Sequence, residues 1–520
     1  MSEKNYYIDQ LNEIGHLISE EKDFQVVMKK ILTTAKKLSN ADAGTFYLLS
    51  SDEKSLEFTA VQTDSLNINL SKAEGTIPWP NLPIYTDNGE NNNINISVYC
   101  ALHSKLINIE DVYHSQEFDF QGPRAFDEST GYRTKSMLVV PMKSYDNTVI
   151  GVLQLINKKD YEGMSIPFEK ADEKLILSMA SQAAVSITQA RLVQDLEKLL
   201  DSFVQSIATA IGEKSKYTQG HINRVASLTT SIANAVNENN DFYKDKYFNE
   251  DQMSELDLAA WMHDIGKITT PDHIVDKATK LEKIYDRIKM IEVRFELLLN
   301  NRYIQMLEEK ALSPENIKKI ERKYNEDIKQ IKSDLEFLQT TNFGGEFMAD
   351  DNIERVYTIA EYQIEVNGEQ QNILTQDEIK NLCIQKGTLT EEERLIINNH
   401  AKLSYDILNS LPFPNKYKRV PEIAAGHHEK INGKGYPLGL KGDEISFEAR
   451  IIAVADIFES LTASDRPYKK PNTIKQSLRI LKFMVKDGEL DEDLVKFFID
   501  KKLYLDYAKN NMNESQIDIV

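Results

Sequence analysis

The chain has 520 residues, and at ~150 residues per domain this length predicts more than one domain. Its formal net charge is −20, which makes the phosphate backbone of a nucleic acid an unfavourable partner, although a local basic or metal-lined pocket can still bind a small anion. Two distant cysteines exclude a disulfide framework, and a polar N-terminus without long apolar runs leads us to expect a cytoplasmic protein with no membrane partner.

Residues 22–190 have a mixed pattern that predicts an α+β module. Apolar runs of strand length occur at 44–49, 136–142 and 149–156, and Tyr145-Asp146-Asn147 between the last two is typical of a hairpin turn. Helical patterns flank these runs, at 24–38 and from 170 onward. We therefore expect an antiparallel sheet with flanking helices.

A helical pattern then continues from 172 to about 212. Its apolar residues are spaced by three or four positions, and no glycine or proline interrupts it before Gly212. Such a helix either pairs with its copy in a homodimer and couples two domains, or packs on its own chain, and the pattern fits both equally.

From residue 213 the sequence is almost wholly helical, but residues 281–386 have a different character. Charged helical stretches at 281–310 and 314–340 flank Ser313-Pro314, which predicts a helical hairpin. Residues 364–374 contain Asn-Gly and predict a β-hairpin. Capping-box spacings at Thr375/Glu378 and Thr390/Glu393 predict two further helix starts. We treat 281–386 as an insertion, serving as a lid, a partner site or a structural spacer.

Histidines and aspartates recur in the helical half of the chain, where they are candidates for metal binding. A lone histidine near a helix end is usually packed or capping, and an aspartate in an apolar run must be paired or bound to a cation. The ordered series is stronger evidence than any one member. His221 opens one helical pattern, His263-Asp264 ends a second and His400 ends a third. The last three members of the series follow them in the chain. The candidate ligands are therefore His221, His263, Asp264, His400, His427, His428 and Asp456.

These side chains can hold two divalent cations, with Asp264 shared between them. A cation pair ~3.5–4 Å apart can activate water and stabilise an in-line displacement at phosphorus. Mixed histidine and aspartate ligation suits iron, manganese or zinc, of which we expect iron or manganese.

Three motifs in this order, HDIGK, HHEKINGKGYP and VADIFESLTASDRPYKK, resemble the HD-GYP family of the HD phosphohydrolase superfamily. The resemblance covers about residues 200–280 and 387–480. It implies an all-α domain with two or three metals that hydrolyses cyclic dinucleotides, chiefly cyclic di-GMP, to pGpG or GMP. It also implies the seven metal ligands above and catalytic roles for Asp264 and Lys267. The implied substrate contacts are Lys267, Gly435, Tyr436, Pro437, Arg466 and Lys469.

The loop after His428 combines tight backbone turns with substrate contact. We expect Gly433 and Gly435 to turn with positive φ and Pro437 to stiffen the loop. Two departures from the family pattern stand out. Tyr217 occupies the position of a glutamate in three-metal members, which favours two metals here. Asn432 replaces the usual aspartate, which removes a charge but keeps the turn preference.

The stretch LINKKDYEGMSIPFEKADE resembles the motif of cyclic-nucleotide-type GAF domains. The matching residues are Asn157, Lys158, Phe168, Asp172 and Glu173, which in such domains support the pocket more than they line it. The resemblance covers about residues 10–190 and implies a small-molecule sensor, with cAMP or cGMP as a candidate ligand. A GAF domain that only dimerises or binds another ligand is the alternative.

Together these expectations give a GAF sensor domain at 10–190, a connecting helix at 191–212, an HD-GYP domain at 200–280 and 387–520, and the insertion at 281–386. We expect a phosphodiesterase for cyclic di-GMP, regulated by the GAF domain. Two rivals remain: a phosphodiesterase for another cyclic nucleotide, such as cyclic GMP-AMP, cAMP or cGMP, and a catalytically silent nucleotide-sensing receptor.

Overall fold

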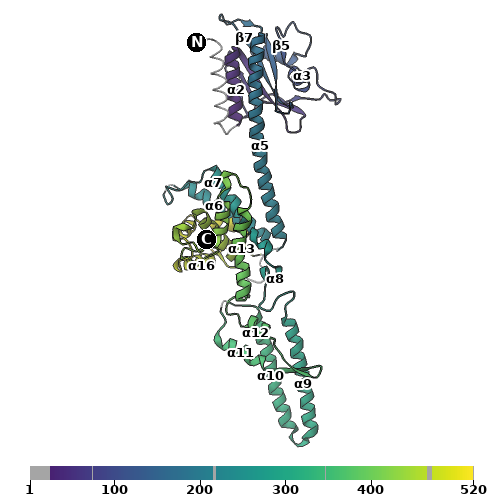
Figure 1. Ribbon diagram of the computed structural model, residues 1–520, viewed down its shortest axis with the longest axis vertical. Helices are drawn as coiled ribbons and strands as arrows, with labels where there is room; N and C mark the ends of the chain where they lie inside the picture. The colour runs from purple at the N-terminus through teal and green to yellow at the C-terminus, as the bar shows by residue number, and fades with distance from the viewer. Residues whose placement is uncertain are drawn as a thin grey trace. The chain divides into compact units, whose positions relative to one another are not determined.

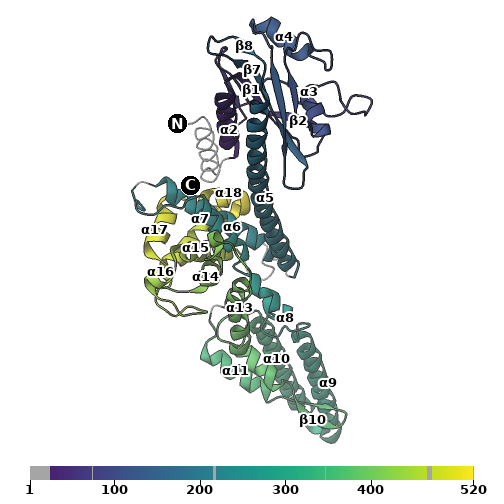
Figure 2. The same cartoon turned by 45° about the horizontal axis from the view of Figure 1, so that its top comes forward.

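The computed structural model describes residues 24–72, 74–214, 218–239, 241–345, 347–464 and 471–518. The chain divides into two compact units, Met1–Leu199 and Leu200–Val520. The predicted α+β unit followed by a largely helical unit is confirmed (Figures 1 and 2). Within the described ranges, none of the helices combines the length and the apolar character needed to cross a bilayer.

The first unit is built on an antiparallel eight-stranded sheet with the main order β3-β2-β1-β7-β6-β5, in which β4 also pairs with β2 and β8 with β7. Its strands are β1 (Ala41–Leu49), β2 (Ser55–Thr63), β3 (Ile68–Ser71), β4 (Leu82–Pro83), β5 (Ile107–Ile109), β6 (Met137–Lys143), β7 (Val149–Lys159) and β8 (Ser165–Ile166). Its helices are α2 (Phe24–Ser39), α3 (Ile96–His103), α4 (Gln121–Thr130) and the start of α5 (Lys170–Lys214).

Helices cover both faces of this sheet. On one face α2 and the first part of α5 pack against β1, β6 and β7, where Phe46, Leu153 and Met179 are completely buried (Figure 1). On the other face α3 and neighbouring loops enclose a second apolar cluster around Tyr47, Phe120 and Met137. The predicted hairpin turn is confirmed, since Asn147 has a φ of 65° and β6 pairs directly with β7.

The long predicted helix is confirmed as α5, and it carries an apolar stripe that faces solvent. Leu192, Leu196, Leu199 and Phe203 are each more than half exposed, and their spacings of four, three and four residues place them along one side. Because such side chains are normally covered, this stripe suggests a partner surface.

The second unit is a helical bundle. Its α-helices are α6 (Thr218–Glu238), α7 (Glu250–Met262), α8 (Asp272–Val275), α9 (Ile288–Leu312), α10 (Ile317–Asn342), α11 (Asp350–Ala360), α12 (Gln376–Leu382), α13 (Glu391–Asn409), α14 (Val420–Ala425), α15 (Phe447–Thr462), α16 (Ile474–Lys486), α17 (Glu492–Asp500) and α18 (Tyr504–Asn511). The 3₁₀ turns are η1 (Ile265–Thr269), η2 (Pro314–Asn316), η3 (Asn415–Tyr417), η4 (Gly426–His428), η5 (Gly442–Glu444) and η6 (Glu514–Gln516). One core joins α6, α7 and α14–α18, with the apolar side of α15 fully buried at its centre.

Residues 281–383 gather around a separate apolar core. The predicted helical hairpin forms from α9 and α10, and β9 (Gln363–Val366) pairs with β10 (Glu369–Asn372) through the Asn367-Gly368 turn (Figure 2). Both predicted capping boxes form, at Thr375 and Thr390. The prediction that the first helix starts at 281 is wrong: residues 282 and 286 form an isolated bridge, and helix α9 begins at Ile288.

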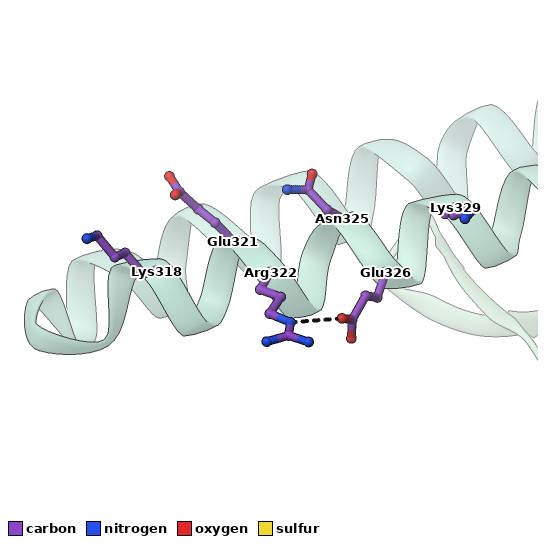
Figure 3. Close-up of a pocket in the computed structure, with 6 residues that line it drawn as sticks. All are labelled: Lys318, Glu321, Arg322, Asn325, Glu326 and Lys329. Atoms are coloured by element: carbon purple, nitrogen blue, oxygen red, sulfur yellow. Dashed lines mark hydrogen bonds and ion pairs between the residues drawn. The ribbon is translucent and has the colours of Figure 1, made fainter.

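A shallow hollow lies along α10, and its lining does not form a binding site. Arg322 and Glu326 form an ion pair of 3.1 Å across one helical turn. Because all the lining residues come from one helix, no opposing element completes a site there. The six are Lys318, Glu321, Arg322, Asn325, Glu326 and Lys329 (Figure 3).

Candidate metal centre

The fold brings all seven candidate ligands to one place in the second unit. His221 lies in the first turn of α6, His263 ends α7 and Asp264 follows it. His400 comes from α13, His427 and His428 from η4, and Asp456 from α15. The prediction that His400 ends its helix is wrong, because the helical pattern of residues 401–409 continues α13 to Asn409.

Asp264 sits between the imidazoles. Its Oδ2 atom lies 3.5 Å from Nε2 of His221 and 3.4 Å from Nε2 of His263, whereas its Oδ1 atom lies 3.3 Å from Nε2 of His400. Asp456 Oδ1 lies 3.2 Å from Nε2 of His221. The two oxygens of Asp264 therefore face different groups of histidines.

The ring orientations of three histidines are fixed in the same way. Nδ1 of His263 donates to the carbonyl of Ala260, three residues earlier, at 2.7 Å. His400 and His427 repeat this contact with the carbonyls three residues before them, at 2.5 and 2.6 Å. Because a carbonyl only accepts, Nδ1 must carry a proton, and in the neutral ring Nε2 then keeps its lone pair for a ligand.

The centre contains buried polar atoms that make no hydrogen bond within the described residues. They are Nε2 of His263, Nε2 of His400, Nε2 of His427 and Oδ1 of Asp264. Leaving such atoms unsatisfied costs ~1–3 kcal/mol each, so a missing partner is indicated. Nitrogen and carboxylate donors suit a divalent transition metal. Three ligand groups can be drawn, each with ligand atoms within 4.8 Å of one another: His400/His427/His428, His221/His263/Asp456 and His263/Asp264/His427.

The surroundings of the centre lower the pKa values of Asp264, His427 and His428. Burial raises the pKa of Asp264, but Lys267 and His263 outweigh it and hold that pKa well below its usual range. Burial and the neighbouring His400 lower the pKa of His428 to about 3. Burial and His428 likewise lower the pKa of His427 well below its usual value. The aspartate is therefore ionised and these two imidazoles are neutral, which are the forms that bind metal.

Lys267, predicted to be catalytic, lies beside the cluster on η1. Its Nζ is 2.5 Å from Oδ2 of Asp264, and its side chain is 20% exposed. Burial lowers the pKa of Lys267, but pairing with Asp264 outweighs burial and raises it, so the ammonium keeps its charge.

Glu459 is a completely buried residue that the sequence reasoning missed. Its carboxylate accepts from Nδ1 of His221 at 2.5 Å and pairs with Arg224 at 2.6 Å. It lies one turn after Asp456 on α15, so its i+3 position on the face of a proposed ligand could have revealed it.

The loop after His428 is held by another overlooked carboxylate. Glu429 accepts hydrogen bonds from the backbone N–H groups of residues 438, 439 and 440 at 2.6, 3.1 and 2.9 Å. Tyr436 lies against His428 with ring centroids 4.8 Å apart, and its peptide bond to Pro437 is cis. The loop thus places Tyr436 at the edge of the metal cluster.

The expectation for the two loop glycines is confirmed at one and wrong at the other. Gly433 has a φ of 77°, but Gly435 is not in the positive-φ region. Gly435 is required by close approach instead, since a Cβ there would lie 2.3 Å from the backbone N of Lys430. Asn432 donates to the carbonyl of Asp487 at 3.0 Å, a bond that an aspartate could not make. Arg466, Lys469 and Tyr217 lie outside the described residues.

The motif residues of the first unit hold its structure together. Lys158 pairs with Asp172 at 2.5 Å, Phe168 is buried in the core, and Glu173 accepts from Asn108 at 2.9 Å. They stand apart from a partly enclosed cavity of about 310 Å³, whose lining includes the aromatic side chains of Tyr47, Phe58, Trp79, Phe126 and Tyr132. This volume lies at the lower end of the range for small-molecule pockets.

The protein families that match this chain fall on the same two units. Residues 23–187 match the GAF domain family, and residues 218–333 and 374–494 match HD domain families.

Several relatives match parts of the chain, including the following three. A cyclic di-GMP phosphodiesterase response regulator of Xanthomonas campestris pv. campestris is 40% identical over 101 residues, 19% of this chain and 26% of the relative. The 3'3'-cGAMP-specific phosphodiesterase 3 of Vibrio cholerae is 40% identical over 104 residues, 20% of this chain and 22% of the relative. A probable cyclic di-GMP phosphodiesterase of Vibrio cholerae is 34% identical over 140 residues, 26% of this chain and 31% of the relative.

The matches to these curated relatives span only 22% to 31% of their lengths. The family matches nevertheless agree in order with the two structural units and with the buried histidine and aspartate cluster. This chain therefore contains a GAF domain at residues 23–187, followed by two regions that match HD domain families.

Proposed function

We propose that this chain is a metal-dependent phosphodiesterase of the HD-GYP type, which hydrolyses cyclic di-GMP to pGpG, GMP or both. The observation that carries the proposal is the convergence of five imidazoles and two carboxylates, among which four buried ligand atoms make no hydrogen bond to any residue that the structure describes. The similarity to cyclic di-GMP phosphodiesterases supports the same substrate class.

The seven residues would hold two divalent cations, iron or manganese, with Asp264 between them. When bound, such cations activate water for attack and offset negative charge at phosphorus. This assignment rests on the opposed directions of Oδ1 and Oδ2 of Asp264, which face His400 on one side and His221 and His263 on the other.

The remaining residues of the site would position the substrate. Lys267 keeps its charge next to Asp264 and would contact a phosphate oxygen, where it would stabilise the developing negative charge. Tyr436 would present its ring to the substrate beside His428. Gly435 and Pro437 would shape this loop, and Arg466 and Lys469 are proposed as further substrate contacts.

A second candidate substrate is 3'3'-cGAMP. A phosphodiesterase specific for it is as similar to this chain, at 40% identity, as the response regulator is. Hydrolysis of cAMP or cGMP and a silent receptor remain alternative functions for a site of this kind.

Metal analysis and turnover of a cyclic-nucleotide panel would test this proposal. We expect purified protein loaded with iron or manganese to hydrolyse cyclic di-GMP, and a chelator to abolish turnover. Asp264→Asn should lower bound metal and reduce kcat by roughly 100-fold or more. Asp406→Asn, an exposed position on α13, is the matched control. Metal-loaded protein that hydrolyses none of the panel would support the silent receptor instead.

We further propose that the GAF domain is a small-molecule sensor, with a cyclic nucleotide as a candidate for its enclosed cavity. It would regulate the HD domain through α5 in a parallel homodimer. The exposed stripe of Leu192, Leu196, Leu199 and Phe203 would form the contact between the two α5 helices. The proposed domain limits are 10–190, 191–212, and 200–280 with 387–520, interrupted by the insertion at 281–386.

A further inference from the structure

The GAF domain has a second cavity, of about 480 Å³, whose chemistry differs from that of the enclosed one. The cations Arg133, Lys135 and Lys159 line it, and no aspartate or glutamate does. The enclosed cavity shows the reverse, because its lining contains Asp119 but no lysine or arginine. All the charged residues that line this cavity are thus cations, although the chain as a whole has a net charge of −20.

Two of these cations are held in place without a carboxylate. The Arg133 guanidinium lies 3.2 Å from the centroid of the Tyr113 ring, so stacking orients it. Lys135 is half-buried and donates to the carbonyl of Ser165 at 3.0 Å. Within the part of the chain that the structure describes, none of the three cavity cations forms an ion pair, whereas the adjacent Lys158 is paired with Asp172 at 2.5 Å.

Asn157 fixes the backbone that carries these cations. Its Nδ2 donates to the carbonyl of Arg133 at 2.7 Å, and its Oδ1 accepts from the backbone N–H of Lys135 at 2.7 Å. Asn157 is buried, has a φ of 57° and itself lines the cavity. The backbone that carries Arg133 and Lys135 is therefore held in place by Asn157, which reduces the entropic cost of binding.

Three cationic residues that line one cavity favour an anion as its ligand, because an anion would offset their charge and accept hydrogen bonds from their N–H groups. We propose that this cavity binds a small molecule that carries phosphate. The site is separate from the proposed catalytic centre, so the inference does not rest on the phosphodiesterase assignment.

Tyr132 connects the new site to the enclosed cavity, since it lines both. Its hydroxyl donates to Oδ2 of Asp42 at 2.7 Å, and Ser65 donates to the same oxygen at 2.7 Å. An anion bound beside Tyr132 would therefore contact a residue that also lines the enclosed cavity, and binding at one site would influence binding at the other.

Calorimetric titration of the full-length chain with pyrophosphate would test the proposal. The experiment uses an Asp264→Asn background, so that anion binding at the proposed metal centre contributes little. Because Lys135→Gln/Lys159→Gln removes two charge-assisted hydrogen bonds, it should weaken binding by more than tenfold, and higher salt should weaken it further. Lys159→Gln alone should weaken pyrophosphate binding several-fold. This single variant still tests the proposal if the double variant folds poorly.

Lys174→Gln is the matched control, because it removes one exposed charge from the same unit outside the cavity. We expect it to leave the affinity within twofold. No pyrophosphate binding at millimolar concentration, no loss in the double variant, or an equal loss in the control would each overturn the proposal. A parallel titration with adenosine diphosphate identifies the source of the phosphate: tighter binding than pyrophosphate indicates a nucleotide, and equal or weaker binding a free phosphate compound.

Discussion

At the residue scale, the centre depends on side chains that orient the ligands as well as on the ligands themselves. Glu459 holds His221 through Nδ1 and is itself held by Arg224, while three other histidines use backbone carbonyls for the same purpose. Such outer contacts fix ring orientation and raise the basicity of a ligand. The orientation of His221 thus depends on a replaceable side chain, unlike that of these three histidines.

We expect Glu459→Gln to weaken metal binding by ~10–100-fold, because it removes the charge that orients and polarises His221. Metal content and the affinity for Mn²⁺ would measure the loss. Glu448→Gln is the matched control: it also removes a buried carboxylate of α15 that pairs with an arginine, Arg419, but one that does not contact the centre. Equal losses in both variants would contradict a positioning role for Glu459.

Two buried lysines of the second unit, three residues apart, lead to opposite predictions. Lys277 pairs with Glu393 at 2.7 Å, whereas Lys280 bonds the carbonyl of Leu382 at 3.0 Å. Burial lowers the pKa of Lys280 from 10.5 to about 8. The folded protein therefore bears the cost of a buried charge below about pH 8, and this cost fades as the pH rises from 8 to 10.5, the unfolded value.

We accordingly expect Lys280→Met to stabilise the protein by about 2 kcal/mol at pH 7, after allowing for the lost hydrogen bond, and to lose this advantage at pH 10.5. Lys277→Met should destabilise it by about 3 kcal/mol, because Glu393 would be left without its partner. Urea unfolding at both pH values would measure the changes. A Lys280→Met variant that is less stable at pH 7 would refute the argument.

At the element scale, α5 has an exposed apolar side that lacks cover within the described residues. Leu196 and Leu199 are 56% and 65% exposed at the centre of the stripe. If two copies pair there, Leu196→Lys/Leu199→Lys should convert a dimer into a monomer, since it places like charges in the seam.

Light scattering after size-exclusion chromatography would measure the mass. Gln194→Lys is the matched control, because position 194 is exposed on the opposite side of the same helix. A wild-type monomer, or a double variant that remains a dimer, would rule out pairing through this stripe.

At the scale of the whole molecule, the proposed coupling of sensor and enzyme can be tested by removal of one unit. Deletion of residues 1–190 should change the rate of cyclic di-GMP hydrolysis several-fold and weaken dimerisation, since it removes the proposed sensor and the start of α5. Turnover and mass of both forms would be compared at equal metal content. If both quantities were unchanged, regulation by the GAF domain would be excluded.

The sequence alone determined those features that depend on local chemistry. Apolar runs of strand length placed β1, β6 and β7, the Thr375 and Thr390 boxes placed the starts of α12 and α13, and the order of histidine motifs identified the ligand candidates. These features follow from neighbours within a few residues, for which the pattern contains enough information.

Only the tertiary structure decided what depends on contacts between distant segments. The bond between Glu459 and His221 joins residues 238 positions apart, and Gly435 is constrained by the backbone of Lys430 rather than by its own φ. Likewise, the cations at 133, 135 and 159 share one cavity because β7 runs beside the segment that leads into β6. Periodicity predicts elements, whereas packing determines which of their side chains meet.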